Sequence, residues 1–286
     1  MSFEAWIGRE TRAKDRLGEG LAHRWLATFD LPRPHPAIMP QGIHFALCTP
    51  AAPTASLGED GHPARDDSPG SFLPPFPLPR RMWASSKIHF HAPIAIGAVI
   101  EQTSAIAAIS EKQGSSGPLA FVDVSRETRS NGTLAVVETQ SIVYREAASG
   151  GLALSPPPLD DRWFLPEGWD AHRTVIPDAQ LLFRYSALTF NTHRIHYDAP
   201  YASKVERYRG LVVHGPLIAS LLLQLAASEL GENRLRSFAF RGLSPAVAGE
   251  PLHLVMRPSQ NVGEAGYELA AFAKDGRQVT QASAAT

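Results

Sequence analysis

The chain has 286 residues, of which 44% are hydrophobic and 19% are charged, and its formal net charge is −1. This composition is typical of a globular protein with one large or two medium domains. Because positive and negative charges nearly balance, we expect no binding to nucleic acid or to an anionic membrane surface.

The cellular compartment is indicated by three features. The single cysteine, Cys48, excludes an internal disulfide framework and is typical of a reducing environment. Residues 1–20 are rich in charge and lack the apolar run of a signal peptide, and the longest apolar run, residues 217–227, is too short to span a bilayer. We therefore expect a cytoplasmic protein.

An internal repeat relates residues 90–97 to residues 240–249. Each copy begins with phenylalanine, contains the pattern Pro-x-x-x-Gly and continues into an alternating apolar run. Further along each half, a tight turn between two strands is indicated by a dipeptide, Asn131-Gly132 or Asp275-Gly276. These dipeptides favour type I′ hairpin turns, in which both central residues need positive φ. The repeat therefore predicts a three-stranded antiparallel meander in each half of the chain.

A helix is expected before each meander. Residues 216–230 begin with a proline at a first-turn position and are apolar on nearly every side, which predicts a helix enclosed by other elements. Residues 42–48 are a shorter equivalent in the first half. A buried helix wrapped by a curved antiparallel sheet, occurring twice, predicts an α+β double hot-dog, which is a fused pseudo-dimer.

Two irregular segments complete the expected organisation. Residues 149–178, with Gly-Gly and triple-proline sequences, are interpreted as a surface linker between an N-terminal half (1–148) and a C-terminal half (179–286). Residues 49–81 are rich in proline. Because long structureless loops inside a domain are often functional, we considered this segment as a wall of a substrate pocket.

Asn191, His196 and Gly215 form the pattern that indicates chemistry. Imidazole titrates near neutral pH and can act as a general base, and a carboxamide can orient a water molecule but cannot take its proton. The N–H of a glycine at a helix start lies at the positive end of the helix dipole and is open to a ligand. These groups suit the addition of water to an α,β-unsaturated thioester, so the pattern predicts a hydratase or dehydratase.

Residues 186–198, Ser-Ala-Leu-Thr-Phe-Asn-Thr-His-Arg-Ile-His-Tyr-Asp, resemble the motif of the MaoC-like, (R)-specific enoyl-CoA hydratases. That motif has a catalytic aspartate, a histidine five residues later and a helix-start glycine, which correspond here to Asn191, His196 and Gly215. The sequence departs from it in having asparagine for aspartate and no proline before the histidine. Asparagine is shared by a subgroup with type 2 3-hydroxyacyl-thioester dehydratases and with mesaconyl-C4-CoA and itaconyl-CoA hydratases. Residues 79–84, Pro-Arg-Arg-Met-Trp-Ala, also resemble this subgroup.

The resemblance implies a hydro-lyase acting on an acyl-CoA, with a catalytically silent N-terminal half that helps to shape the acyl tunnel. A short branched C5 dicarboxylic substrate, itaconyl-CoA or mesaconyl-C4-CoA, is the first choice, and a monocarboxylic 3-hydroxyacyl thioester is the alternative. A free carboxylate needs a cation, for which Arg80 and Arg81 are candidates. The other expected substrate-binding residues are Trp83, Arg207, Arg209 and His214, the two arginines beside the site being candidates for the coenzyme A phosphates.

Other interpretations remain open at this point. A hot-dog thioesterase needs a carboxylate to activate water, which asparagine replaces poorly, and a non-catalytic acyl-CoA sensor would need a segment to transmit its signal. We expect no cofactor besides the thioester substrate. We also expect no metal site, because His193 and His196 have no cysteine or acidic partner at zinc spacing. A homodimer is possible.

Overall fold

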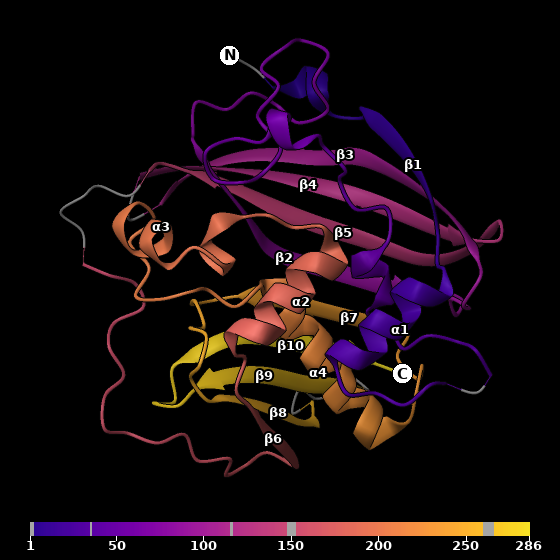
Figure 1. Cartoon of the computed structure of the whole chain (residues 1–286), viewed down its shortest axis with the longest axis vertical. Helices are drawn as coiled ribbons and strands as arrows, with labels where there is room; N and C mark the ends of the chain where they lie inside the picture. The colour runs from indigo at the N-terminus through magenta and orange to yellow at the C-terminus, as the bar shows by residue number, and fades with distance from the viewer. Residues whose placement is uncertain (1–2, 35, 115–116, 148–152, 260–265) are drawn as a thin grey trace.

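The computed structural model describes residues 3–34, 36–114, 117–147, 153–259 and 266–286. Its strands form one antiparallel sheet in the order β1-β3-β4-β5-β2-β7-β10-β9-β8-β6 (Figure 1). The elements of the first half are β1 (Glu10–Arg16), α1 (Glu19–Thr28), β2 (Arg80–Phe90), β3 (Val99–Gly114), β4 (Gly117–Ser130) and β5 (Thr133–Arg145). Those of the second half are β6 (Ala171–Val175), α2 (Ala179–Thr189), α3 (Ala199–Lys204), α4 (Gly215–Leu230), β7 (Ser237–Gly242), β8 (Leu252–Pro258), β9 (Tyr267–Ala273) and β10 (Gln278–Ala285).

The strand order reads the same from both edges of the sheet. The series β1-β3-β4-β5-β2 in the first half corresponds to β6-β8-β9-β10-β7 in the second, and β2 pairs with β7 where the halves meet. The helices α1, α2 and α4 lie together on one side of this sheet (Figure 1). Buried side chains of both halves, among them Trp25, Tyr185, Leu217 and Phe238, form one core. The repeat and the double hot-dog fold predicted from the sequence are therefore confirmed.

The two predicted hairpins differ in their turns. Asn131 and Gly132 have φ of 49° and 80°, as a type I′ turn requires. In the second hairpin only Gly276 has positive φ (82°), and its N–H donates to the carbonyl of Ala273 at 3.0 Å. This hairpin is therefore a type I turn followed by a left-handed glycine, and the pairing of β9 with β10 shifts register just beyond it. The meander was predicted correctly and this turn type was not.

The helix α4 is buried on nearly all sides and packs against β6, β8 and β9, as its apolar sequence predicted. Its expected equivalent at residues 42–48 is only one turn of 3-10 helix, Ile43–Ala46. The helical conformation ends at Leu47, whose backbone is extended (φ −109°, ψ 147°), and Pro50 disfavours the α region for the residue before it. The long helix of the first half is instead α1, which packs against α2.

The predicted linker is shorter than its sequence suggested. Residues 171–175 form β6 and pair with β8, so that the second repeat begins before residue 179. Ala171 and Val175 lie opposite Met256 and Leu252, both of which are buried, so burial of apolar surface favours the strand. Among the helices that the structure describes, none is long and apolar enough to cross a membrane.

Candidate active site

One cavity of about 1040 Å³ lies between the halves and contains the expected catalytic residues. Asn191, His196 and Gly215 all line it, although they follow α2, precede α3 and begin α4 respectively. Much of the opposite wall comes from residues 49–75 of the proline-rich segment and from β2. This segment is therefore a wall of the cavity, as the sequence analysis considered.

His196 is held in one tautomer. Its Nδ1–H donates to the carbonyl of Val212 at 2.7 Å, which leaves the lone pair of Nε2 available to take a proton. Burial, with a smaller contribution from His193, lowers the pKa of His196 to about 3, so the ring is neutral at physiological pH. The arrangement provides a neutral imidazole base of fixed orientation.

Asn191 is placed by the end of α2. Phe190 adopts the left-handed conformation with φ of 49°, and the N–H of Asn191 donates back to the carbonyl of Ser186 at 2.9 Å. The side-chain oxygen of Asn191 accepts from the N–H of His193 at 2.9 Å. Its NH2 group and one carbonyl lone pair remain to hold a water molecule or substrate oxygen.

Gly215 is the first residue of α4, where backbone N–H groups have no acceptor within the helix. A Cβ built on this glycine meets no atom within 4 Å, so the space in front of it is open to a ligand. The preceding residue, His214, is 2% exposed and is hydrogen-bonded through Nε2 to Ser186 Oγ at 2.9 Å. The ring of His214 therefore forms part of the wall beside His196, and its buried Nδ1 has no hydrogen-bond partner among the described residues.

The four arginines expected to bind substrate differ in their surroundings. Arg80 forms an ion pair of 2.7 Å with Glu206, so its charge is already balanced. Arg209 is paired through both terminal nitrogens with Glu250 and is not among the residues that line the cavity, so the structure does not bring it together with the other expected residues. Arg81 and Arg207 line the cavity. Arg81 has no carboxylate partner within 4.0 Å in the described part of the chain, and its charge is near enough to lower the pKa of His193.

Trp83, also expected at the site, lies in the cavity wall on β2. Its Nε1–H donates to Ser86 Oγ at 2.9 Å, and that hydroxyl donates to Glu138 Oε1 at 2.5 Å. Burial raises the pKa of Glu138, which Arg126 opposes. These buried hydrogen bonds hold the indole ring against Phe45, with ring centroids 5.7 Å apart. The two rings form an apolar surface, and the polar groups that hold the indole N–H lie beneath it.

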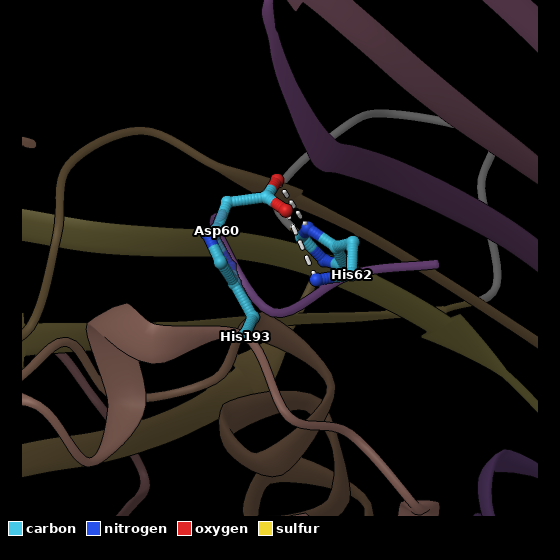
Figure 2. A group of neighbouring side chains, drawn as sticks. All are labelled: Asp60, His62 and His193. Carbon is cyan, nitrogen blue, oxygen red and sulfur yellow. Dashed lines mark hydrogen bonds and ion pairs between the residues drawn. The ribbon is translucent and has the colours of Figure 1, made fainter. Parts of the chain in front are cut away.

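A cluster that the sequence analysis missed lies beside the catalytic segment. Figure 2 shows Asp60 and His62 of the proline-rich segment next to His193. His62 Nδ1–H donates to Asp60 Oδ2 at 2.9 Å, and the ring centroids of His62 and His193 are 4.1 Å apart. Burial opposes ionisation of Asp60, but the hydrogen bonds from His62 outweigh it and lower its pKa to about 2. The contact between His62 and His193 could not be predicted from sequence spacing, because 131 residues separate them.

The cluster has residue types that bind metals, and one ligand atom from each residue lies within 4.8 Å of the others. The planes of the His62 and His193 rings are only 33° apart, however, so the rings lie nearly face to face. Imidazole lone pairs lie in the ring plane, and nearly parallel stacked rings direct them past one another rather than toward one ion. This geometry does not suit tetrahedral coordination of one ion.

Comparisons with known proteins identify the family of the chain. Residues 42–248 match the family model "Hydroxyacyl-thioester dehydratase type 2". The chain is 43% identical to the mesaconyl-C(4)-CoA hydratase of Chloroflexus aurantiacus over 89% of each chain. It is 28% identical to the mitochondrial hydroxyacyl-thioester dehydratase type 2 of Schizosaccharomyces pombe, over 77% of this chain and 78% of that one.

A solved MaoC-like dehydratase superposes with a TM-score of 0.73 at 12% identity, over 99% of this chain and 98% of that chain, which shows a shared fold. The family match and the relative at 43% identity each cover most of the chain. The chain therefore belongs to the hydroxyacyl-thioester dehydratase type 2 family, a family of hydro-lyases with the MaoC-like double hot-dog fold.

Proposed function

We propose that the protein adds water to the double bond of a short, branched C5 dicarboxylic acyl-CoA, with mesaconyl-C4-CoA or itaconyl-CoA as the substrate. The observation that carries this proposal is one cavity lined by a neutral imidazole, a helix-start N–H and an arginine without an acidic partner among the described residues. The relative named mesaconyl-C(4)-CoA hydratase supports the same substrate class. The reaction needs no cofactor besides the coenzyme A thioester itself.

In this proposal Gly215 stabilises the charge that develops on the thioester oxygen. As water adds to the β-carbon, the electrons of the double bond move toward the carbonyl and form an enolate. The N–H of Gly215 donates to that oxygen at the positive end of α4. Loss of one such donor typically costs about 3 to 4 kcal/mol of transition-state stabilisation.

His196 and Asn191 act on the water molecule. The free Nε2 of His196 takes a proton from the water as the new C–O bond forms, and Nδ1–H keeps the ring oriented through Val212. Asn191 holds the water with its NH2 group, because its own carbonyl is partly used by the N–H of His193. The carboxamide carries no proton in either direction.

Arg81 binds the free carboxylate of the substrate. Burying a carboxylate requires a compensating charge, and Arg81 supplies one that no described carboxylate neutralises. Its neighbour Arg80 is unsuited to this role because Glu206 already occupies its guanidinium group. Arg207 contacts the phosphates of coenzyme A, and Trp83 covers the acyl group.

A substrate panel tests the proposal. Loss of the absorbance of the unsaturated thioester is measured with crotonyl-, itaconyl- and mesaconyl-C4-CoA for the wild type and for Arg81→Met. We expect the wild type to prefer the dicarboxylic thioesters by about 10²-fold or more, and Arg81→Met to lose that preference while keeping its rate on crotonyl-CoA. A wild type that is equally active on crotonyl-CoA contradicts the dicarboxylic assignment. Release of free thiol without hydration indicates a thioesterase.

A monocarboxylic 3-hydroxyacyl thioester is the second candidate substrate. The relative named hydroxyacyl-thioester dehydratase type 2 favours it, at lower identity. The volume of the cavity, about 1040 Å³, leaves room for an acyl chain longer than five carbons. Dehydration of 3-hydroxyacyl-CoA substrates of increasing length, with rates that rise with length, distinguishes it from the first candidate.

A further inference from the structure

Three histidine rings connect the proline-rich segment of the first half to the catalytic segment of the second. His62 lies 4.1 Å from His193 and His193 lies 5.4 Å from His196, measured between ring centroids. His62, His193 and His196 all line the cavity, and Asp60 is hydrogen-bonded to His62 (Figure 2). A row of imidazoles thus begins at a carboxylate and ends at the proposed base.

The proline-rich segment that carries His62 is held to the catalytic segment by hydrogen bonds to its backbone carbonyls. Thr192 Oγ1 donates to the carbonyl of Gly61 at 2.6 Å, and the N–H of Arg194 donates to the carbonyl of Asp60 at 2.9 Å. A Cβ on Gly61 would lie 1.9 Å from the carbonyl oxygen of Thr192, so only glycine allows this approach. The position of His62 relative to Asn191 and His196 is therefore fixed by the fold.

The hydration reaction needs a second group that carries a proton, and the catalytic segment does not supply one. Asn191 replaces the carboxylate found in the family motif and cannot accept a proton. Burial lowers the pKa of both His196 and His193 to about 3, and that of His214 well below its usual value. A proton taken from water by His196 is therefore poorly held there, because its ring neighbours are neutral imidazoles.

His62 differs from these three rings in having a carboxylate partner. Both oxygens of Asp60 accept from His62, one from the ring at 2.9 Å and the other from the backbone N–H at 3.0 Å. The other charged and titratable groups around the pair of His62 and His193 are Arg81, His196 and His214, with Tyr201 and Glu206 beyond Asp60. An ionised Asp60 stabilises a positive charge on His62.

We propose that His62 is the second catalytic residue, which delivers a proton to the α-carbon, and that Asp60 is its positioning residue. This inference rests on the proposed hydratase function. The oxygen of water bonds to the β-carbon while its proton moves to His196 Nε2, and the enolate then forms a C–H bond with the proton of His62 Nε2. After product release the proton on His196 passes to solvent and His62 takes a proton from solvent, so that both rings return to their starting states. One water molecule is consumed and no net charge remains, so that the first half supplies the acid that Asn191 does not.

The test uses two substitutions of His62 and a matched control. His62→Asn keeps an N–H that reaches Asp60 but has no nitrogen in the place of Nε2, and we expect kcat to fall by about 10²-fold or more with KM nearly unchanged. His62→Ala should regain activity when imidazole is added to the assay, which a structural role does not explain. His91→Asn, at an exposed histidine outside the site, should retain the wild-type rate. Melting temperatures of all the variants show that each is folded.

Asp60→Asn and Asp60→Ala test the positioning role through kcat and KM. The carboxamide of Asp60→Asn can still accept from His62 Nδ1–H, so we expect it to keep much of the wild-type kcat, whereas Asp60→Ala removes the acceptor and should lower kcat by about 10-fold or more with KM nearly unchanged. Equal losses of kcat in the two folded variants contradict the role given to Asp60.

Four results overturn the assignment of His62. They are a wild-type kcat in His62→Asn, the absence of imidazole rescue in folded His62→Ala, a wild-type kcat in folded Asp60→Ala, and wild-type activity that is lost with a chelator and restored by zinc, which makes the cluster a metal site. In each of these results the wild type still hydrates the thioester, so the proposed function stands. A wild type that hydrates no thioester of the panel contradicts the proposed function, and the role of His62 with it.

Discussion

The ring of His196 stacks on the ring of His214, with centroids 3.5 Å apart and planes 20° from parallel. His214 is in turn held by Ser186 of α2 and packs against Tyr185, with ring centroids 5.1 Å apart. The orientation of the proposed base is therefore set from two directions, by the carbonyl of Val212 along the ring edge and by His214 on the ring face.

Removal of this stack should affect catalysis without direct loss of a reacting group. We expect His214→Ala to lower kcat by about 10²-fold, because a displacement near 1 Å of the base is sufficient for such an effect. His214→Phe keeps a flat ring in the same place and should retain most of the wild-type kcat. Equal losses in the two variants contradict the stacking role, and steady-state kinetics on the preferred thioester measure them.

Gly215→Ala should fold normally but react poorly. A Cβ at this position meets no atom of the described chain within 4 Å, and alanine is favourable in a helix, so the free energy of unfolding should change by less than about 1 kcal/mol. The added methyl group occupies the space through which the thioester reaches the N–H, so we expect kcat/KM to fall by about 10²-fold. Thermal unfolding and kinetics on the same preparation separate the two effects. A variant with wild-type kinetics would show that the oxyanion is held elsewhere.

Gly61→Ala should release the proline-rich segment from the catalytic segment. Gly61 has a φ of 85°, and its Cβ would overlap the carbonyl of Thr192. Gly8 has the same φ of 85° but has open space around its Cβ, so Gly8→Ala reports the backbone strain alone. We expect Gly8→Ala to cost about 1 kcal/mol of unfolding free energy and Gly61→Ala to cost clearly more. Chemical denaturation compares them, and equal costs contradict the close contact.

The stability of the protein should fall in mildly acidic solution. Burial lowers the pKa of His44, His193 and His196 to about 3, whereas histidines of the unfolded chain titrate near 6.5. Below that pH the unfolded chain binds protons that the folded chain does not. The contribution of these rings is therefore complete above about pH 6.5 and decreases as the pH falls toward 3, by up to about 1.4 kcal/mol per pH unit for each ring.

Denaturation in urea at pH 7.5 and 5.5 measures this slope. His44→Gln removes one of the buried rings and should reduce the slope. His23→Gln, at an exposed histidine, is the matched control for the substitution itself. A slope that is the same in the wild type and His44→Gln contradicts the assignment to buried imidazoles.

The neighbours Arg80 and Arg81 should respond differently to the same substitution. Arg80→Met leaves Glu206 without its ion-pair partner, and burial raises the pKa of that carboxyl group. Breaking one side of a buried pair typically costs about 3 to 5 kcal/mol, so we expect a marked loss of unfolding free energy but unchanged preference for dicarboxylic substrates. Arg80→Met with Glu206→Leu should recover much of the loss. A changed substrate preference in Arg80→Met would show that Arg80, and not Arg81, binds the free carboxylate of the substrate.

The sequence was most informative where the determining contacts are local. Asn131-Gly132 specifies its turn through the backbone preferences of two residues, and the apolar circumference of α4 predicts burial without any knowledge of its neighbours. The roles of Asn191, His196 and Gly215 were suggested by a motif whose three parts line one cavity. These features need little information about distant parts of the chain.

The features that could not be predicted depend on contacts between distant segments. Asp60 and His62 reach His193 because Gly61 allows its backbone to contact that of the catalytic segment. A contact of this kind between distant segments cannot be predicted from residue spacing. Arg209 was expected in the site because it is near it in sequence, but Glu250 lies closer in space. Charge alone did not distinguish Arg80 from Arg81, because the difference between them is the carboxylate of Glu206.

The two repeats pair through β2 and β7 and belong to one polypeptide, which has a consequence for the number of active centres per chain. Two identical hot-dog subunits related by true symmetry would have to use every loop twice and build two equal centres. Covalent fusion removes that obligation, because the first repeat can specialise in the proline-rich wall while the second specialises in α2 and α4. Titration with a tight-binding reaction-intermediate analogue should accordingly saturate at one equivalent per polypeptide.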